Sequence, residues 1–498
     1  MTAAHQEDVP PPGLKVPWMH PLAGVLALGV VALLYHVPRL SPGAYSFTET
    51  ECVASSLAQG HGFSSPFGGS TGPTAWVPPV PVWFEATVFK VFGIQTVSCA
   101  VARIVLTVLG LSLAHWVLIC SVAPLGRIAR FAASVTFLVT VAIIPEGPLD
   151  TLSEAWMTIL LSVAVLSSCL GYLRSSSTRD AAALCVLAPI GVLTDAGLAL
   201  ALGAVILGLA VVGWRRGRTP RGPILAAALA CLGLAGWTTR NAVALKAIVP
   251  LKSNLWFELY LANVVSRDGL VRAEDALVAQ PFFHGPQWDR YRAMGEVAYV
   301  RSFKEGVTRS LAADPGHFAA NVRRRLMSAV ALSILDTGGA ITWARFPAQD
   351  VARLQKAELL LPLPGIGGSF WRKLDASPDE TFAALSSLGL SRVDLAWRDW
   401  AEHRSAYDKE CARVSRVAAE ALMSGVPFLS LLLLLLIEGR RVSPVVLWSA
   451  LIAVVMLLPF VIINLGPRHQ IPVIGLMAVW VGALVEAVAG HYRALKHR

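Results

Sequence analysis

Residues 98–122 read SCAVARIVLTVLGLSLAHWVLICSV, a stretch in which Arg103 is the only Asp, Glu, Lys or Arg. A helix rises about 1.5 Å per residue, so a block of this length can cross the roughly 30 Å hydrocarbon core of a bilayer. Similar blocks recur along a chain of 498 residues that is 55% hydrophobic and 15% charged. Because soluble domains carry about 25% charged residues, the sequence predicts an all-α polytopic membrane protein.

The apolar blocks predict about ten transmembrane helices joined by loops and loop helices. They cover residues 21–37, 98–122, 128–145, 152–173, 181–194, 196–214, 223–239, 418–438, 442–464 and 471–489. Only Asp195 separates the fifth block from the sixth, so this boundary is the least defined.

Basic side chains gather in the connections between blocks, as they do in cytoplasmic loops of membrane proteins. They lie at 127–130, 174–179, 214–221, 440–441 and in the tail 491–498. This pattern accounts for the net charge of +10 without a nucleic-acid partner. It places both termini in the cytoplasm of a plasma (inner) membrane protein and the remaining connections outside.

The orientation predicts four parts of the chain. They are a cytoplasmic tail (1–20), an N-terminal membrane domain (21–240) with an outer loop at 38–97, a mostly outer helical region (241–417), and C-terminal membrane helices with a cytoplasmic tail (418–498). Two further apolar segments would reverse the predicted orientation of every later helix if they crossed the membrane. We therefore expect an outer interfacial helix at 78–93 and a membrane-associated segment without a net crossing at 326–344.

The first outer loop contains YSFTETECVASSLAQGHGFSSPFGGSTGPTAWVPPVP at residues 45–81. Thr48 and Glu51 have the S/T-x-x-E spacing of a capping box, which assigns Glu51 to the helix cap. Glu49 is then the freer carboxylate, and at a helix N-terminus beside a membrane it is a candidate general base. The alternative is that both acids only cap a solvated helix. Trp76 is either a substrate contact or an interfacial anchor.

A second outer loop carries Glu146, Asp150 and Glu154. Thr151 and Glu154 repeat the capping-box spacing, which leaves Asp150 as the freer acid. Two acid-bearing loops on one side predict a site between them, to which Glu51 and Glu154 contribute as substrate contacts. The chain has no metal-ligand motif, and a divalent cation held by Glu49 and Asp150 stays an open alternative.

Several basic side chains are expected on the outer side, against the usual charge distribution, and so indicate an anionic ligand such as a phosphate or a lipid headgroup. They are Arg240, Lys246, Lys252, Arg468 and His469. Arg103 stands about one turn inside the outer end of its block, where it either snorkels to the surface or binds a phosphate.

Five short motifs occur in a fixed order: A-x-x-L-x-x-G-H-G-F at 54–63, T-G-P-T-A-W-V-P-P-V-P at 71–81, F-K-V-F-G at 89–93, W-T-T-R-N at 237–241 and R-H-Q-I-P at 468–472. This order is similar to that of bacterial GT-C type glycosyltransferases, relatives of the protein O-mannosyltransferases and lipid A aminoarabinose transferases. The resemblance implies a GT-C-like fold and transfer of a sugar from a polyprenyl-phosphate donor to a glycan, lipid or protein acceptor outside the membrane.

In that family a carboxylate of the first outer loop is catalytic. Relatives usually have Asp-Glu where this chain has Thr48-Glu49, so the resemblance assigns catalysis to Glu49. The second acid corresponds to Asp150 or Glu154. Relatives often carry a basic residue where this chain has Thr194-Asp195.

The expected mechanism has Glu49 deprotonate an acceptor hydroxyl while Arg240, Arg468 or Arg103 stabilises the leaving phosphate. Two other classes of membrane protein stay open as alternatives. A transporter or lipid flippase would place ionisable groups at mid-membrane and often shows inverted repeats, which this sequence lacks. An inactive membrane scaffold is favoured by the missing Asp. An enzyme should bring Glu49, a second acid and an arginine together at one outer cavity open to the bilayer.

Overall fold

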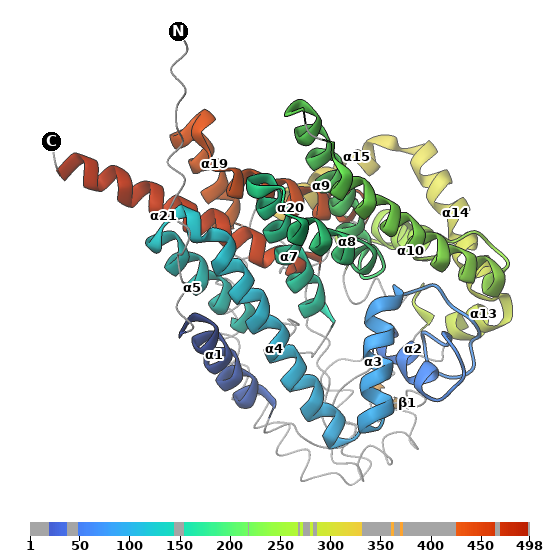
Figure 1. The fold of residues 1–498 in the computed structure, drawn as a ribbon. Helices are drawn as coiled ribbons and strands as arrows, with labels where there is room; N and C mark the ends of the chain where they lie inside the picture. The colour runs from blue at the N-terminus through green and yellow to red at the C-terminus, as the bar shows by residue number, and fades with distance from the viewer. Residues whose placement is uncertain are drawn as a thin grey trace, which may run out of the picture.

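The structure is a computed structural model and describes residues 19–36, 48–143, 154–217, 219–266, 269–271, 279–281, 286–330, 360–362, 369–371, 425–463 and 469–496. These residues are almost entirely helical (Figure 1). The α-helices are α1 (Met19–His36), α2 (Glu49–Ala58), α3 (Pro79–Phe92), α4 (Val97–Val122), α5 (Arg127–Ile143), α7 (Ala155–Ser175), α8 (Thr178–Val192), α9 (Ala196–Arg215), α10 (Arg221–Leu245), α11 (Leu255–Tyr260), α13 (Pro286–Met294), α14 (Glu296–Ala313), α15 (Pro315–Val330), α19 (Val426–Glu438), α20 (Pro444–Ile462) and α21 (Ile474–Lys496).

Shorter elements complete the description. A π-helical turn covers Leu261–Val265, and 3-10 turns cover Ala123–Leu125, Gly439–Arg441 and Ile471–Val473. Strands β1 (Leu360–Pro362) and β2 (Ser369–Trp371) pair as an antiparallel hairpin.

Six helices are long and apolar enough to cross a membrane, which makes the chain a multi-pass membrane protein. They are α4 with its 3-10 extension, α7, α9, α10, α20, and α21 with the 3-10 turn before it. All ten predicted blocks contain a helix. However, α5, α8 and α19 have only 17, 15 and 13 residues, and α1 is apolar over Leu22–Leu33. Among the described residues, six of the ten expected crossings therefore fall on helices with the length and composition of a membrane span.

Successive long helices run in opposite directions, so their connections gather at two ends of the bundle. At one end Arg216 Nη1 donates a hydrogen bond to Leu173 O at 3.0 Å. There Ala129 N also donates to Glu486 Oε2, likewise at 3.0 Å. We call this the basic end, because it holds the basic connections 123–130, 174–179 and 213–221 and the C-terminal turns of α21.

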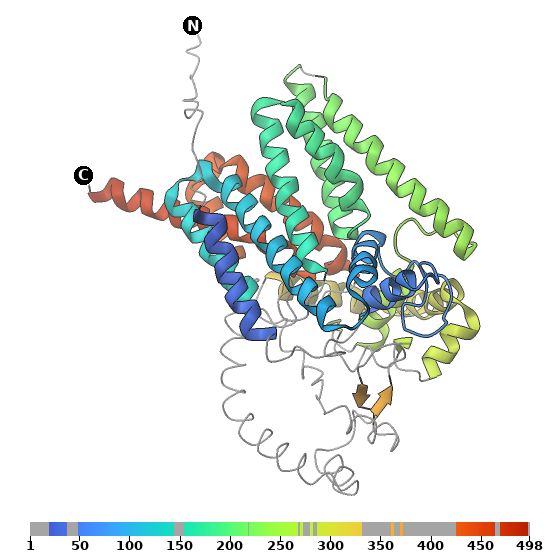
Figure 2. The same cartoon turned by 60° about the horizontal axis from the view of Figure 1, so that its bottom comes forward.

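The opposite end, the polar end, holds α2, α3, the loop between them and α11 to α15. Val80 N donates to Leu193 O at 3.1 Å, which joins the start of α3 to the end of α8. Figure 2 shows α2 and α3 (blue) and α13 and α14 (yellow-green) together at this end.

A helix is present where the sequence predicted one at 78–93. It is α3, which has 14 residues and is not among the six helices long enough to span a membrane. Thr96 caps the next helix, α4, by accepting a hydrogen bond from Cys99 N at 3.0 Å. The placement of α3 at the membrane interface stays a prediction. The other expected non-crossing segment, 326–344, begins in α15 and lies outside the described residues from 331 onward.

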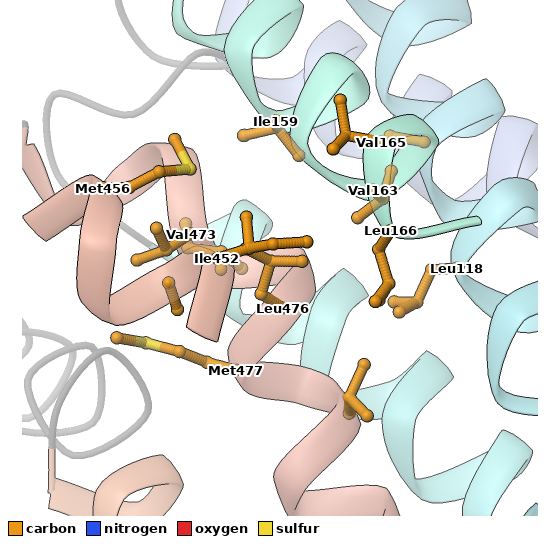
Figure 3. Close-up of a cluster of buried hydrophobic side chains, with 14 of the residues drawn as sticks. Leu118, Ile159, Val163, Val165, Leu166, Ile452, Met456, Val473, Leu476 and Met477 are labelled. Atoms are coloured by element: carbon orange, nitrogen blue, oxygen red, sulfur yellow. The ribbon is translucent and has the colours of Figure 1, made fainter. Parts of the chain in front are cut away.

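The core of the bundle forms between α4, α7, α20 and α21 (Figure 3). Side chains such as Leu118, Val163, Ile452 and Met477 pack there. α21 is central: Trp480 is fully buried and donates from its indole nitrogen to Ser449 Oγ at 3.0 Å. In contrast, α4 leaves every fourth side chain exposed, which is the lipid-facing stripe of a membrane helix. The stripe comprises Val97, Val101, Val105, Leu109 and Leu113.

Arg325 fixes α15 to the end of α20 and is fully buried. Its Nε donates to Val461 O at 2.8 Å and its Nη2 to Ile462 O at 3.0 Å, the last carbonyls of α20. Nη1 donates to Gly269 O and Ala262 O at 3.1 and 3.3 Å, and Nη2 also donates to Asn263 Oδ1 at 3.2 Å. Burial without a carboxylate lowers the pKa of Arg325 to about 10.

The change Arg325→Lys should lower the free energy of unfolding by about 1–2 kcal/mol, because an ammonium has three donors for five acceptors. Thermal unfolding in detergent would measure the loss. Arg301→Lys, an exposed arginine of α14, is the control and should change little. An Arg325→Lys protein as stable as the wild type would contradict the role of Arg325 as a tie between α15 and α20.

Candidate active site

Helix α2 begins with the capping box predicted from the sequence. Thr48 N donates to Glu51 Oε2 at 2.7 Å, and the Thr48 side chain caps the helix in return. Glu51 is nevertheless not a solvated cap, because it is 2% exposed and its Oε1 lies 2.5 Å from Arg103 Nη2. The first turn of α2 is therefore held against α4 by a buried ion pair.

Arg103 has a second carboxylate partner that the sequence analysis missed. Arg103 Nε lies 3.3 Å from Glu85 Oε2 of α3, and both side chains are buried. Burial is the largest cause that raises the pKa of Glu85 to about 7; Arg103 opposes the shift, and Glu51 and Glu154 add to it. Glu85 is the sole acid in the apolar segment 78–93, and this isolation is the feature of the sequence that could have marked it as a site residue. Arg103 thus pairs with protein acids, in place of the snorkelling or phosphate contact that was expected.

Glu154 joins the same group from the second outer loop. It stands directly before α7, makes no cap hydrogen bond there, and its Oε1 accepts a hydrogen bond from Thr50 Oγ1 at 3.1 Å. Its pKa is raised, first by burial and then by the charge of Glu51. The first turn of α2 and the start of α7 therefore meet through Thr50 and Glu154.

Glu49 lies at the first position of α2 and is half-buried. Gln280 Nε2 donates to its Oε1 at 2.8 Å, across 231 positions of sequence. Among the residues that the structure describes, Glu49 takes part in no ion pair. Within this part of the chain it is consequently a carboxylate that Gln280 orients and that has no arginine partner. The other expected members, Asp150 and Arg468, lie outside the described residues.

Arg240 holds the loop between α2 and α3. Its Nη1 donates to Thr74 O at 2.6 Å and its Nη2 to Phe63 O at 2.7 Å. The guanidinium also lies 5.0 Å from the ring centres of both Phe63 and Trp237. Arg240 was expected to contact a phosphate, but in this structure its terminal nitrogens are engaged by backbone carbonyls.

Glu296 holds the same loop from the other side. It accepts hydrogen bonds from Ala75 N at 2.7 Å, from Tyr291 Oη at 2.8 Å and from the Thr74 hydroxyl. Burial raises the pKa of this carboxyl. Trp76, which follows Ala75 in this loop, is only 3% exposed, so it is neither an interfacial anchor nor an exposed substrate contact.

Trp76 belongs to the core of the polar end, where its ring centre lies 4.8 Å from that of Phe67 and 5.0 Å from that of Phe257. The remaining candidate, His469, stacks on Phe460 of α20 at 4.3 Å. The structure therefore gathers Glu49, Glu51, Glu154 and Arg103 around one turn of α2. It adds Glu85 and Gln280 and gives Trp76 and Arg240 structural roles.

The group can hold and move protons. Glu51 and Glu85 pair with Arg103, and Glu154 interacts electrostatically with both acids, so full ionisation of the three carboxyls would leave two charges in excess of this one guanidinium in a buried place. A proton on Glu85 near neutral pH relieves part of this charge. Within the described ranges no cluster of three or more His, Cys, Asp or Glu side chains could hold a metal ion.

Replacing Glu85 by Gln tests this protonation. The native protein keeps a proton between pH 4.5 and about 7 that the unfolded chain has released, so its free energy of unfolding falls by about 3 kcal/mol as the pH rises through this window. Glu85→Gln should remove that part of the slope. Thermal unfolding in detergent at pH 5 and pH 8 measures it, and an unchanged slope would show that Glu85 does not titrate here.

Comparisons with known protein families, curated proteins and solved structures find no match to this chain. A function for it must therefore be argued from the residues of the site and from the order of the sequence motifs.

Proposed function

We propose that the protein is a GT-C-like glycosyltransferase that moves a sugar from a polyprenyl-phosphate donor to an acceptor on the outer face of the inner membrane. The observation that carries the proposal is Glu49: a half-buried carboxylate at a helix N-terminus, oriented by Gln280, in the same helical turn as Thr50, which binds Glu154, and Glu51, which pairs with Arg103. In this proposal the basic end and both termini are cytoplasmic.

We assign the base to Glu49 because Gln280 orients its carboxylate, whereas Glu51 is paired with Arg103, and burial and the charge of Glu51 raise the pKa of Glu154. Glu49 takes the proton from an acceptor hydroxyl, and the hydroxyl oxygen forms a bond to the anomeric carbon of the sugar. The bond between that carbon and the phosphate oxygen breaks, and the lipid phosphate leaves with the electron pair.

The leaving phosphate needs a cation. Arg103 lies between two carboxylates and Arg240 binds two carbonyls. We assign the phosphate contact to Arg468, which lies outside the described residues, on the R-H-Q-I-P motif alone. The nature of the sugar and the acceptor is set by contacts beyond these groups.

Deletion of the coding sequence tests the proposal in cells. We expect one sugar to disappear from a cell-envelope glycan, lipid or protein while its polyprenyl-phosphate donor accumulates in the outer leaflet. Expression of the wild-type chain should restore the sugar. Accumulation of the donor in the inner leaflet would favour a flippase, and an unchanged envelope with unchanged donor would favour a scaffold.

A further inference from the structure

Helix α15 exposes apolar side chains and buries polar ones. Its buried stripe includes Asn321, Arg325 and Ser328, which are 0%, 0% and 2% exposed. Its outer face carries Leu326 and Met327, which are 50% and 58% exposed. A surface helix in water has the opposite arrangement, with its apolar stripe toward the core. The outer face of α15 therefore calls for an apolar neighbour.

The helix cannot correct this arrangement by rotating about its axis. All five N–H groups of Arg325 are directed at the end of α20 and at the segment around Asn263 and Gly269. A rotation that buried Leu326 and Met327 would pull these donors from their acceptors. The exposed face is thus fixed by the buried one.

The position of α15 shows which apolar neighbour is available. α20 exposes a stripe of apolar side chains that continues to its last turn, where Arg325 binds its terminal carbonyls. The stripe comprises Leu451, Val454, Leu458 and Ile462. Because α20 is one of the six candidate spans, its end marks the boundary between hydrocarbon and headgroups. α15 lies at this boundary.

The positive charge on the outer face of α15 is complementary to an anionic lipid headgroup. Arg323 and Arg324 are exposed beside Met327, and Arg324 Nη1 also donates to Asn321 Oδ1 at 3.3 Å. These two arginines, Leu270, Met327 and Ser328 line a cavity of about 500 Å³. Its lining is mostly apolar and suits an acyl chain, while the exposed residues Arg323 and Arg324 border it and supply positive charge for the attached phosphate.

We propose that α15 lies in the plane of the membrane and binds an anionic phospholipid. Leu326 and Met327 enter the acyl boundary, and Arg323 and Arg324 bind the lipid phosphate in the cavity. This site is independent of the glutamate group at α2, so it holds whether or not the protein transfers sugar.

Depth-dependent quenching tests the placement. Met327→Cys, in a chain with Cys231 and Cys411 changed to Ser, is labelled with an environment-sensitive fluorophore in nanodiscs. We expect blue-shifted emission that brominated lipids quench and aqueous iodide does not. Thr308→Cys on α14 is the control and should show the reverse. Emission at position 327 that iodide quenches, or that neither agent quenches because protein covers it, would overturn the proposal.

Lipid retention tests whether Arg323 and Arg324 bind an anionic phospholipid. The full-length protein is extracted from mixed phosphatidylglycerol and phosphatidylcholine, and the retained lipids are counted by native mass spectrometry. The double change Arg323→Gln and Arg324→Gln should reduce the retained phosphatidylglycerol by about 30-fold relative to phosphatidylcholine, since each arginine near an anionic surface contributes about 1 kcal/mol. The pair Arg301→Gln and Arg309→Gln on α14 is the control. Equal retention in the two double variants would contradict the site.

Discussion

Replacing Glu49 with Gln should lower the rate of sugar transfer about 10²- to 10⁴-fold and leave the fold intact. A glutamine amide has the size of the carboxylate and its oxygen still accepts the hydrogen bond from Gln280 Nε2, but it cannot take a proton from the acceptor hydroxyl. The initial rate is measured in membranes supplied with labelled polyprenyl-phosphate sugar and the acceptor.

The matched control for this change is Glu305→Gln. Glu305 is an exposed acid of α14, 78% exposed and paired with Arg309 four residues later. The Glu305→Gln variant loses the same charge as Glu49→Gln and should transfer sugar at the wild-type rate. If Glu49→Gln transferred sugar as fast as the control, Glu49 would not be the base.

The largest loss of stability is expected for Glu51→Gln. This change leaves Arg103 buried without its nearer counter-ion, and breaking a buried pair from one side costs about 3–5 kcal/mol. The loss should be greater at pH 5 than at pH 8. At pH 5 Glu85 is protonated, so neither position 51 nor Glu85 offers Arg103 a negative charge, whereas at pH 8 Glu85 ionises and takes the place of Glu51.

Thermal unfolding of detergent-solubilised protein at the two pH values measures this effect. The double variant Glu51→Gln and Arg103→Met is the control, because removal of both charges should recover part of the stability. A Glu51→Gln protein that is as stable as the wild type at pH 5 would rule out the buried pair.

Local patterns in the sequence predicted much of the framework. The apolar blocks marked the positions of the long helices, and the Thr48–Glu51 spacing marked the start of α2. Charge in the connections predicted which helix ends lie together. These features depend on residues within a few turns of one another, so they can be read without knowing the tertiary contacts.

Long-range pairing could not be read in this way. Spacing assigned Glu51 to a cap alone, while its ion pair with Arg103 joins residues 52 positions apart. Gln280 reaches Glu49 from a segment with no recognisable motif. Arg240 looked like a phosphate ligand because of its charge at the polar end, but its acceptors are the carbonyls of Phe63 and Thr74.

Product analysis with the purified protein tests the central claim, transfer from a lipid-phosphate donor, most directly. The protein in nanodiscs receives polyprenyl-phosphate sugars singly, with an envelope extract as the source of acceptor, and free polyprenyl phosphate is quantified by mass spectrometry. We predict that one donor yields free polyprenyl phosphate and a glycosylated acceptor in equal amounts, with the wild type and with Glu305→Gln but not with Glu49→Gln. Folded wild-type protein that releases polyprenyl phosphate from none of the donors would contradict the account.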